Sequence, residues 1–374
     1  MLTRAITDLP ALVAALPDDE RRRFERLIHV TASEGELVPP PEMRPWIERH
    51  FGSVVAVARQ RVVKTTNLVT YEGTVFNPLR AARPIEATEA LDLERAIAAT
   101  VGDPFCAPLV GTPADLFGRV RGRHAVTASN VARYDAWHAV VVFDEHHPLR
   151  FTAETLADLF DLGRRWAEEV LRRDPAARYF FLLWNCLWKA GASILHGHAQ
   201  IACTRGRHYA RVEGLRAAAE RYRAQYGSSY VADLLAAHRA LGLTLERGDT
   251  QVMVSLTPVK EKEVWLVAPG LTDDLAAAAF QVLDTYVWRL GVRSFNLALL
   301  QPPLRPAPED WAGFPTIVRI VDRGPPESRT ADVAAMELYA ASVVASDPFA
   351  LAAALRGAGV GEPPQADLTG RGPS

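Results

Sequence analysis

The chain has 374 residues, 49% of them hydrophobic and 23% charged, a composition typical of a soluble globular protein with one large or two medium domains. Its net charge of −2 argues against a general nucleic-acid binder, and its apolar runs are far shorter than a membrane span. The N-terminus lacks a secretory apolar segment and the 3 cysteines are widely spaced, so we expect a cytoplasmic protein without a disulfide framework.

The first part of the chain, residues 1–65, is predicted to be a helical extension. Pro17 to Glu20 is typical of a helix start, and Phe24, Leu27 and Ile28 form an apolar stripe behind it. Strands are predicted at residues 53–63 and 67–76.

Residues 66–205 are predicted to form a unit of strands around one long helix. The helix covers Thr152–Arg173, because Thr152 can cap it and apolar residues recur on one of its faces. A continuous apolar run from Tyr179 to Trp184 predicts a strand that is buried on both faces. The other strands of this unit are predicted at residues 126–130 and 139–143.

The remainder repeats that order after a helical insertion at residues 206–248. Residues 249–356 again show strands, a helix and strands, but no histidine occurs after His238. The tail at residues 357–374 is rich in Gly, Pro and polar residues and is predicted to be disordered. The predicted fold is therefore α+β, with two similar units of antiparallel sheet and packed helices.

The segment 185–200, NCLWKAGASILHGHAQ, concentrates polar groups between apolar neighbours. His196, His198 and Gln200 alternate with small or apolar residues, so a strand would turn all three to one face. Two histidines at this spacing have three readings: paired metal ligands, a nucleophile with its supporting group, or the solvated face of a strand. The buried run before them and the glycine-containing turn at residues 191–193 favour a binding or catalytic site.

A second motif is the loop around Arg80 and Arg83. Two arginines three residues apart, beside prolines, make a fixed cationic loop suited to bidentate phosphate contacts. Surface arginines are common, so an ordinary solvated loop is the alternative.

Together these motifs resemble the galactose-1-phosphate uridylyltransferase branch of the histidine-triad superfamily, over about residues 75–348. In that branch a His-x-His-x-Gln strand follows an asparagine that lies eleven residues before its first histidine. The interval from Asn185 to His196 keeps this spacing. The resemblance implies two units of the histidine-triad type, of which only the first has catalytic histidines.

The resemblance also assigns roles. It implies that His198 is the nucleophile that accepts a nucleotidyl group and that Gln200 holds the phosphoryl oxygens. Asn185 and Ser193 match contacts to the phosphates.

Three further matches concern the nucleotide sugar. Arg80 and Arg83 match a family loop that reaches its phosphates, and Asn130 matches an asparagine that holds the nucleoside. Glu337 matches a glutamate near the sugar. The family's other C-terminal sugar-binding residues are poorly matched, which leaves the sugar itself open.

Members of this family commonly bind zinc through a Cys-x-x-Cys pair and two histidines. Here Asp103 replaces the first cysteine, and Cys106, His146 and His196 occupy the other positions. Because aspartate also ligates zinc, an Asp-Cys-His-His site is one reading. A site without metal, in which Asp103 and His146 form hydrogen bonds directly, is the other.

The function implied by the resemblance is a ping-pong nucleotidyltransferase. Its donor would be a nucleotide diphospho-sugar or a dinucleotide, and its acceptor a phosphate or a sugar phosphate, as in a hexose-1-phosphate uridylyltransferase that uses UDP-glucose or in a nucleotide-sugar phosphorylase. A metal-dependent phosphohydrolase with His196 and His198 as ligands, or a non-catalytic nucleotide-binding relative, are the alternatives. We expect no nucleic-acid or membrane partner; the family often forms homodimers. Among the other histidines, His138 is predicted to be satisfied within the sheet, and His147 and His208 to be exposed.

Overall fold

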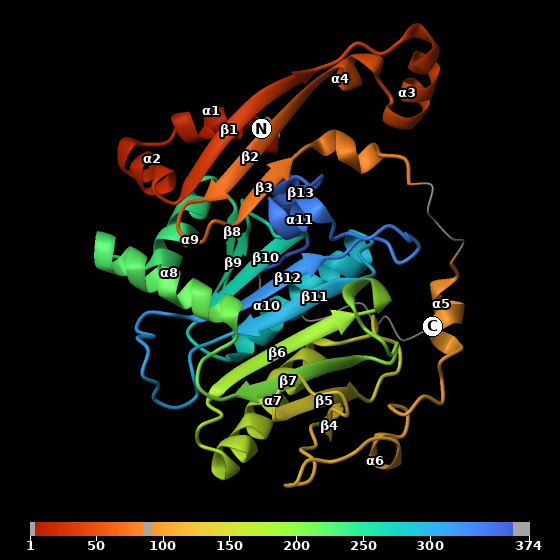
Figure 1. Cartoon of the computed structure of the whole chain (residues 1–374), viewed down its shortest axis with the longest axis vertical. Helices are drawn as coiled ribbons and strands as arrows, with labels where there is room; N and C mark the ends of the chain where they lie inside the picture. Colours follow the sequence, from red (N-terminus) through yellow and green to blue (C-terminus); the bar gives the residue numbers. More distant parts are fainter. Residues whose placement is uncertain (1–3, 86–90, 362–374) are drawn as a thin grey trace.

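The computed structural model describes residues 4–85 and 91–361 and has an α+β architecture built on two sheets (Figure 1). The larger sheet has nine antiparallel strands in the order β4-β5-β7-β6-β11-β12-β10-β9-β8, and the smaller has the order β1-β2-β3-β13.

The elements are η1 (Ile6–Asp8), α1 (Leu9–Ala14), α2 (Asp18–Glu25), β1 (Ile28–Glu36), η2 (Pro41–Met43), α3 (Arg44–Phe51), α4 (Val54–Ala58), β2 (Arg59–Asn67), β3 (Gly73–Phe76), η3 (Pro78–Ala82), α5 (Leu93–Ala98), α6 (Pro108–Gly111), β4 (Ala125–Ser129), β5 (Trp137–Phe143), α7 (Ala153–Arg173), β6 (Tyr179–Cys186), η4 (Trp188–Ala190), β7 (His198–Thr204), α8 (Ala210–Tyr226), α9 (Tyr230–Ala240), β8 (Thr244–Arg247), β9 (Thr250–Val254), β10 (Glu261–Ala268), α10 (Asp273–Asp284), η5 (Thr285–Arg289), β11 (Phe295–Leu300), β12 (Thr316–Asp322), α11 (Ala335–Tyr339), β13 (Ser342–Val344) and α12 (Pro348–Gly357).

The nine-stranded sheet consists of two halves with the same internal order. Strands β4, β5, β7 and β6 lie in the first half in the order that β9, β10, β12 and β11 follow in the second. The halves join through an antiparallel pairing of β6 with β11, and helices α7 and α10, which follow β5 and β10, pack against each other. The predicted pseudo-repeat is confirmed. It places β6, the strand predicted from the buried apolar run, beside β11, which is its counterpart in the second half.

Alternation along the strands decides which residues face the helices. Gly163 of α7 lies against Phe180 and Leu182 of β6, and a Cβ atom at Gly163 would lie 3.1 Å from the Phe180 ring. Side chains one position out of phase, such as Asn185 of β6 and Gln200 of β7, therefore point to the opposite face. The polar residues of the predicted site lie on the face away from α7.

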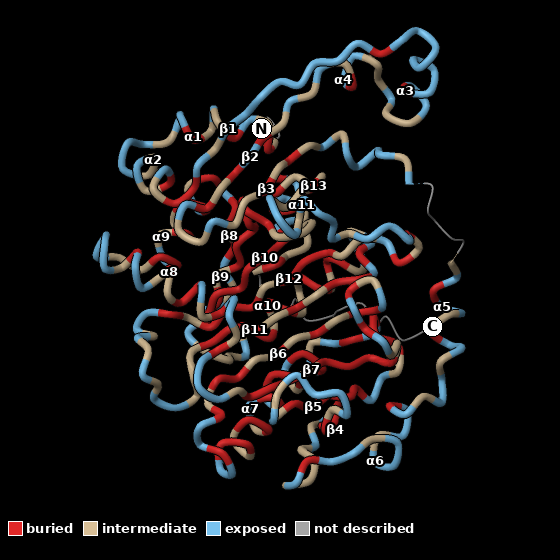
Figure 2. Tube along the Cα trace, viewed as in Figure 1, coloured by how far each residue is buried: buried red, intermediate tan, exposed pale blue. Residues whose placement is uncertain are grey.

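Aromatic packing at the centre of the sheet joins the two halves. Trp184 of β6 is fully buried, and its ring meets those of Phe143, Phe151 and Phe295 edge-on at centroid distances of 5.1, 5.3 and 5.0 Å. Such aromatic pairs contribute about 0.5–1.5 kcal/mol each beyond the burial of their area. Figure 2 shows that buried residues concentrate along this sheet.

The N-terminal part differs from the prediction, because it contains strands as well as helices. Strand β1 was not predicted: beyond Ile28 its residues are largely exposed on both faces, so no apolar alternation marks it (Figure 2). The strand predicted from residue 53 begins instead as helix α4. Ser53 caps that helix by accepting a hydrogen bond from the Ala56 amide at 3.2 Å.

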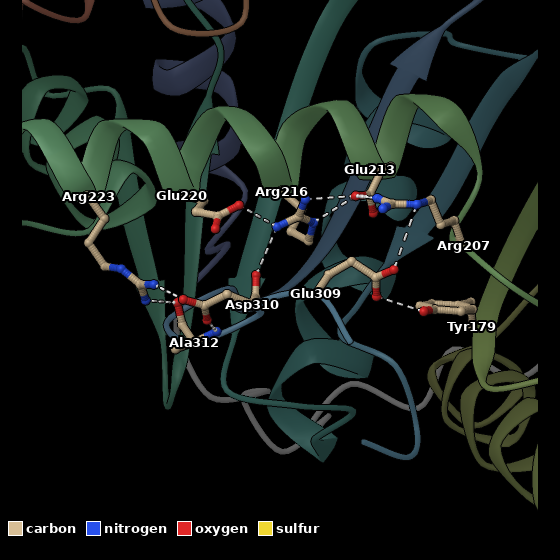
Figure 3. Close-up of polar contacts among 9 residues, drawn as sticks. All are labelled: Tyr179, Arg207, Glu213, Arg216, Glu220, Arg223, Glu309, Asp310 and Ala312. Carbon is tan, nitrogen blue, oxygen red and sulfur yellow. Dashed lines mark hydrogen bonds and ion pairs between the residues drawn. The ribbon is translucent and has the colours of Figure 1, made fainter. Parts of the chain in front are cut away.

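Helices α8 and α9 lie within the predicted insertion at residues 206–248, but its last part forms strand β8 of the larger sheet. Arginines tie α8 to the loop between β11 and β12 (Figure 3). Arg216 donates to Glu220 at 2.7 Å and to the Asp310 carbonyl at 3.1 Å. Arg223 donates to the Asp310 carboxylate and to the Ala312 carbonyl. These bonds help to hold α8 beside the open face of the second half, where it lines one wall of a cavity of about 560 Å³.

In the part of the chain that the structure describes, none of the helices combines the length and the apolar character needed to cross a membrane. The tail predicted to be disordered begins at residue 357, but Gly357 ends α12 and Val360 is buried; residues 362–374 lie outside the described residues.

Candidate functional site

His198 is the first residue of β7, and its ring is held by its own chain. The Nδ1 atom lies 2.8 Å from the His196 carbonyl oxygen, which accepts its proton, so the neutral ring keeps an unprotonated Nε2. Burial lowers the pKa of His198 below its ordinary value, which favours the neutral ring. Phe105 packs edge-on against it at 5.1 Å. The ring therefore presents a fixed, unprotonated nitrogen.

Gln200, two residues further along β7, is oriented by His138 of β5. The Tyr134 amide donates to His138 Nδ1 at 2.9 Å, so Nε2 carries the proton and donates to Gln200 Oε1 at 2.9 Å. The Tyr134 ring also stacks on His138 at 4.3 Å. Because the Gln200 oxygen is occupied, its amide NH₂ remains as the donor. A hollow of about 200 Å³ adjoins these residues, with Phe181 and Tyr209 also in its lining.

Asn185, near the end of β6, is oriented in the same way from the second half of the sheet. Asn296 of β11 lies directly opposite and donates to Asn185 Oδ1 at 2.7 Å. Asn185 therefore also keeps its NH₂ group as a donor. The loop beside it turns at Gly191, whose φ of 99° favours glycine, and Ser193 lies exposed in the same loop.

The four residues predicted as metal ligands lie together. One candidate ligand atom each from Asp103, Cys106, His146 and His196 lies within 4.8 Å of all the others. Cys106 Sγ lies 3.4 Å from His146 Nδ1 and 3.6 Å from His196 Nδ1. The two Nδ1 atoms are 3.0 Å apart, and His196 Nδ1 is 3.7 Å from an Asp103 oxygen. For tetrahedral zinc, standard bond lengths give about 3.6 Å between sulfur and nitrogen and about 3.3 Å between nitrogens.

The hydrogen bonds around this cluster leave its inner atoms free to bind a cation. His196 Nε2 lies 2.7 Å from the Phe143 carbonyl and His146 Nε2 lies 3.1 Å from the Ile97 carbonyl, so the Nδ1 atoms of both neutral rings carry lone pairs. Two lone pairs repel at 3.0 Å unless a proton or a metal ion lies between them. Asp103 Oδ2 is buried without a hydrogen-bond partner. The donor set therefore fits a divalent metal such as zinc.

The other predicted residues divide into two groups. Asn130 lies beside His138 of β5, the residue that contacts Gln200: its oxygen accepts from the Ala132 amide, and its Nδ2 is 3.4 Å from His138 Nε2. Arg80 and Arg83 are exposed in and just after η3, which follows β3, and Glu337 lies in α11, which precedes β13. Strands β3 and β13 pair with each other, and among the described residues no hydrogen bond or ion pair links these three side chains to β7.

Two histidines expected to be exposed are buried. His147 Nε2 donates to Glu94 Oε1 at 3.2 Å, because its Nδ1 accepts from the Leu149 amide. His208 donates to the Phe180 carbonyl at 3.2 Å and accepts from the Tyr209 amide at 2.8 Å, and burial lowers its pKa to about 4. The prediction was wrong because the contacts of these histidines with Glu94 and with the Phe180 carbonyl join segments that are distant in the chain. The prediction that His138 is satisfied within the sheet is confirmed, since both of its ring nitrogens have partners. That its partner is Gln200, and that Asn296 contacts Asn185, was not predicted, because both contacts cross strand pairs.

Neither the protein-family models nor the sequences of curated proteins match this chain. Solved structures do match. An ADP-glucose phosphorylase from Arabidopsis thaliana with bound ADP-glucose superposes with a TM-score of 0.61 at 16% identity, over 78% of this chain and 97% of that one. A GalT-like protein from Arabidopsis thaliana gives 0.57 at 16% identity, over 69% and 92%. A uridylyltransferase gives 0.54 at 18% identity, over 66% and 88%.

At these identities the likeness concerns the fold, and it covers most of each neighbour's length. The repeated strand order, the His-x-His-x-Gln strand and these neighbours agree. The chain therefore shares its fold with these phosphorylase, GalT-like and uridylyltransferase structures.

Proposed function

We propose that this chain is a nucleotidyltransferase that acts on a nucleotide diphospho-sugar or a dinucleotide through a covalent nucleotidyl-histidine on His198. The observation that carries the proposal is the bond between His198 Nδ1 and the His196 carbonyl, which leaves Nε2 unprotonated. A histidine nucleophile needs this arrangement, because the attacking nitrogen must carry a lone pair while the other nitrogen keeps its proton.

In the first step, His198 Nε2 attacks the α-phosphorus of the donor. A nitrogen–phosphorus bond forms, and the bond from the α-phosphorus to the bridging oxygen breaks. The electron pair leaves with that oxygen on the departing phosphate, sugar phosphate or nucleotide. Throughout this step the Nδ1 proton stays on the bond to the His196 carbonyl, so no proton has to be removed from the nucleophile.

In the second step, an oxygen of an incoming phosphate or sugar phosphate attacks the same phosphorus. The nitrogen–phosphorus bond then breaks, and its electron pair returns to Nε2. Both transition states spread negative charge over the phosphoryl oxygens. The NH₂ groups of Gln200 and Asn185, whose oxygens are already bonded, and the Ser193 hydroxyl are the donors that we assign to those oxygens.

We assign Asp103, Cys106, His146 and His196 as ligands of a zinc ion. Bound there, zinc would supply structural cross-linking, tying the loop that carries Asp103 and Cys106 to the start of β7. The backbone carbonyl of the ligand His196 also orients His198. A zinc ion that fixes His196 would therefore also help to fix the nucleophile.

The alternative of a metal-dependent phosphohydrolase requires both histidines of the His-x-His pair as ligands. Among the described residues, the candidate ligand atoms that gather within 4.8 Å belong to Asp103, Cys106, His146 and His196, and His198 is not one of them. This difference favours His198 as a nucleophile over His198 as a second metal ligand.

Intact-protein mass spectrometry after brief incubation with UDP-, ADP- and GDP-sugars and dinucleoside polyphosphates tests the proposal. We expect a nucleoside monophosphate adduct on the wild-type protein and none on His198→Ala. His147→Gln serves as a matched control, since it changes a buried histidine in the loop after β5 that contacts Glu94 and none of the residues assigned to the reaction. The mass of the adduct identifies the base.

Binding of a donor without an adduct would overturn the covalent mechanism and leave a non-catalytic nucleotide-binding protein. Product formation from donor and water alone, lost on chelation, would instead support the phosphohydrolase. Release of labelled nucleotide from the adduct by phosphate, compared with glucose 1-phosphate and galactose 1-phosphate, distinguishes a phosphorylase from a hexose-1-phosphate transferase.

A further inference from the structure

The second half of the sheet has no histidine, yet it contacts a residue that we assign to the phosphates in the first half. Asn296 of β11 lies opposite Asn185 of β6 in the register that joins the halves. Its Nδ2 atom donates to Asn185 Oδ1 at 2.7 Å and to the Ala190 carbonyl at 2.9 Å. One side chain of the second half therefore binds both the Asn185 amide and the loop that follows it.

The orientation of the Asn296 amide is determined by its partners. Arg323, just after β12, donates Nη1 to Asn296 Oδ1, and its Nε and Nη2 donate to the two carboxylate oxygens of Asp332 at 2.6 and 2.9 Å. If the Asn296 amide were reversed, its oxygen would face two other oxygens and its NH₂ would face the guanidinium. The amide can therefore take only one orientation, because the reversed one replaces three hydrogen bonds with repulsive contacts.

This orientation is passed on to Asn185. Since Asn185 Oδ1 accepts from Asn296, its own NH₂ group must point away from β11. There it lies beside the loop containing Gly191, where a Cβ atom would be 3.9 Å from Asn185 Nδ2.

We propose that Asn296, held by Arg323 and Asp332, is a positioning residue that presents the Asn185 NH₂ group to the phosphoryl oxygens, an inference that rests on the proposed function. The second half thus contributes to the reaction of the first without a catalytic group of its own. Asn296 acts through Asn185, as His138 does through Gln200.

The test is the substitution Asn296→Asp. The carboxylate keeps the size of the side chain and can still accept from Arg323, but it places an acceptor where Asn185 Oδ1 finds its donor. Asn185 must then reverse its amide, and its NH₂ group turns away from the phosphates. We expect the single-turnover rate of His198 nucleotidylation to fall about 10- to 100-fold, with kcat more affected than KM, because the lost bond strengthens in the transition state.

Two further variants separate positioning from general damage. Ser294→Ala removes another bond between the halves, from Ser294 Oγ to the Cys186 carbonyl at 2.8 Å, without touching the Asn185 amide, and it should leave the rate unchanged. In an Asn185→Ala background, Asn296→Asp should have little further effect on the rate, because the group through which it acts is already absent. Circular dichroism and melting temperatures establish that the variants are folded.

A wild-type rate in Asn296→Asp, or a full additional loss in the Asn185→Ala background, would overturn the inference. If the wild-type protein forms no adduct with any donor, the proposed function fails instead. The role of Asn296 is then tested by calorimetric titrations that measure the affinity for ADP and UDP. Asn296→Asp must weaken this binding in the wild-type background and leave it unchanged in the Asn185→Ala background. Equal affinities in the wild-type background would overturn it.

Discussion

Replacing Cys106 by serine tests the metal cluster directly. Serine keeps the shape of the side chain but lacks the sulfur atom that lies 3.4 and 3.6 Å from the two histidine nitrogens. A metal that binds only the folded protein stabilises it by about 2.7 kcal/mol when its free concentration is 100 times Kd. An unfolding entropy of about 2.1 cal/mol/K per residue gives about 0.8 kcal/mol/K for this chain, and hence a rise in Tm of about 3 °C.

The assay is differential scanning calorimetry of chelator-treated protein with and without added zinc, together with zinc content by mass spectrometry. We expect one zinc per wild-type chain and a rise in Tm of about 3 °C on reloading, and neither in Cys106→Ser at the same zinc concentration. His147→Gln is the matched control and should bind zinc like the wild type, because His147 contacts Glu94 outside the cluster. Equal zinc content and equal Tm shifts in wild type and Cys106→Ser would refute the assignment.

Three further predictions concern the fold around the site. Burial lowers the pKa of His208 and of His238 to about 4, below the ordinary value near 6.5, so their contribution to stability is complete above pH 6.5 and falls by roughly 3 kcal/mol each as the pH approaches 4. Urea unfolding at pH 7.5 and 4.5 should show this loss, and a smaller loss in His238→Gln; an unchanged difference would contradict it. Gly197→Ala would place a Cβ atom 2.9 Å from the Phe143 ring, so we expect a loss of about 1–3 kcal/mol in urea unfolding and a lower nucleotidylation rate; wild-type values for both would argue against this packing. Thr152→Ala removes the cap of α7 and should cost about 1 kcal/mol, whereas Thr152→Ser should cost little, as measured by the same unfolding experiment; equal losses would exclude capping as the cause.

Several features of the fold could be predicted from the sequence because they leave a local pattern. The apolar run from Tyr179 marks β6, and the stripe behind Thr152 marks α7. These elements are long or fully buried, so their periodicity or continuous apolar character is unambiguous. Strand β1 lacked such a signal because neither of its faces is covered beyond Ile28.

The residue types of the candidate site could likewise be predicted from the sequence. The spacing of Asn185, His196, His198 and Gln200 indicated a site, and the resemblance added Asp103, Cys106 and His146 from other segments. What it left open was whether those groups meet, because that depends on segments distant in the chain. The structure brings the four candidate ligands within 4.8 Å of one another.

Only the tertiary structure decided how the donors of the site are oriented. An amide side chain looks the same in sequence whichever way it points, and its orientation depends on partners supplied by neighbouring strands. The register of β6 with β11 places Asn296 against Asn185, and the β5–β7 pair places His138 near Gln200. The sequence by itself determined which chemical groups the protein has and which elements carry them. The pairing of distant strands decided which of their atoms remain free to bind a substrate. Each hydrogen bond across the sheet occupies the oxygen of a side-chain amide and leaves its NH₂ group as the remaining donor.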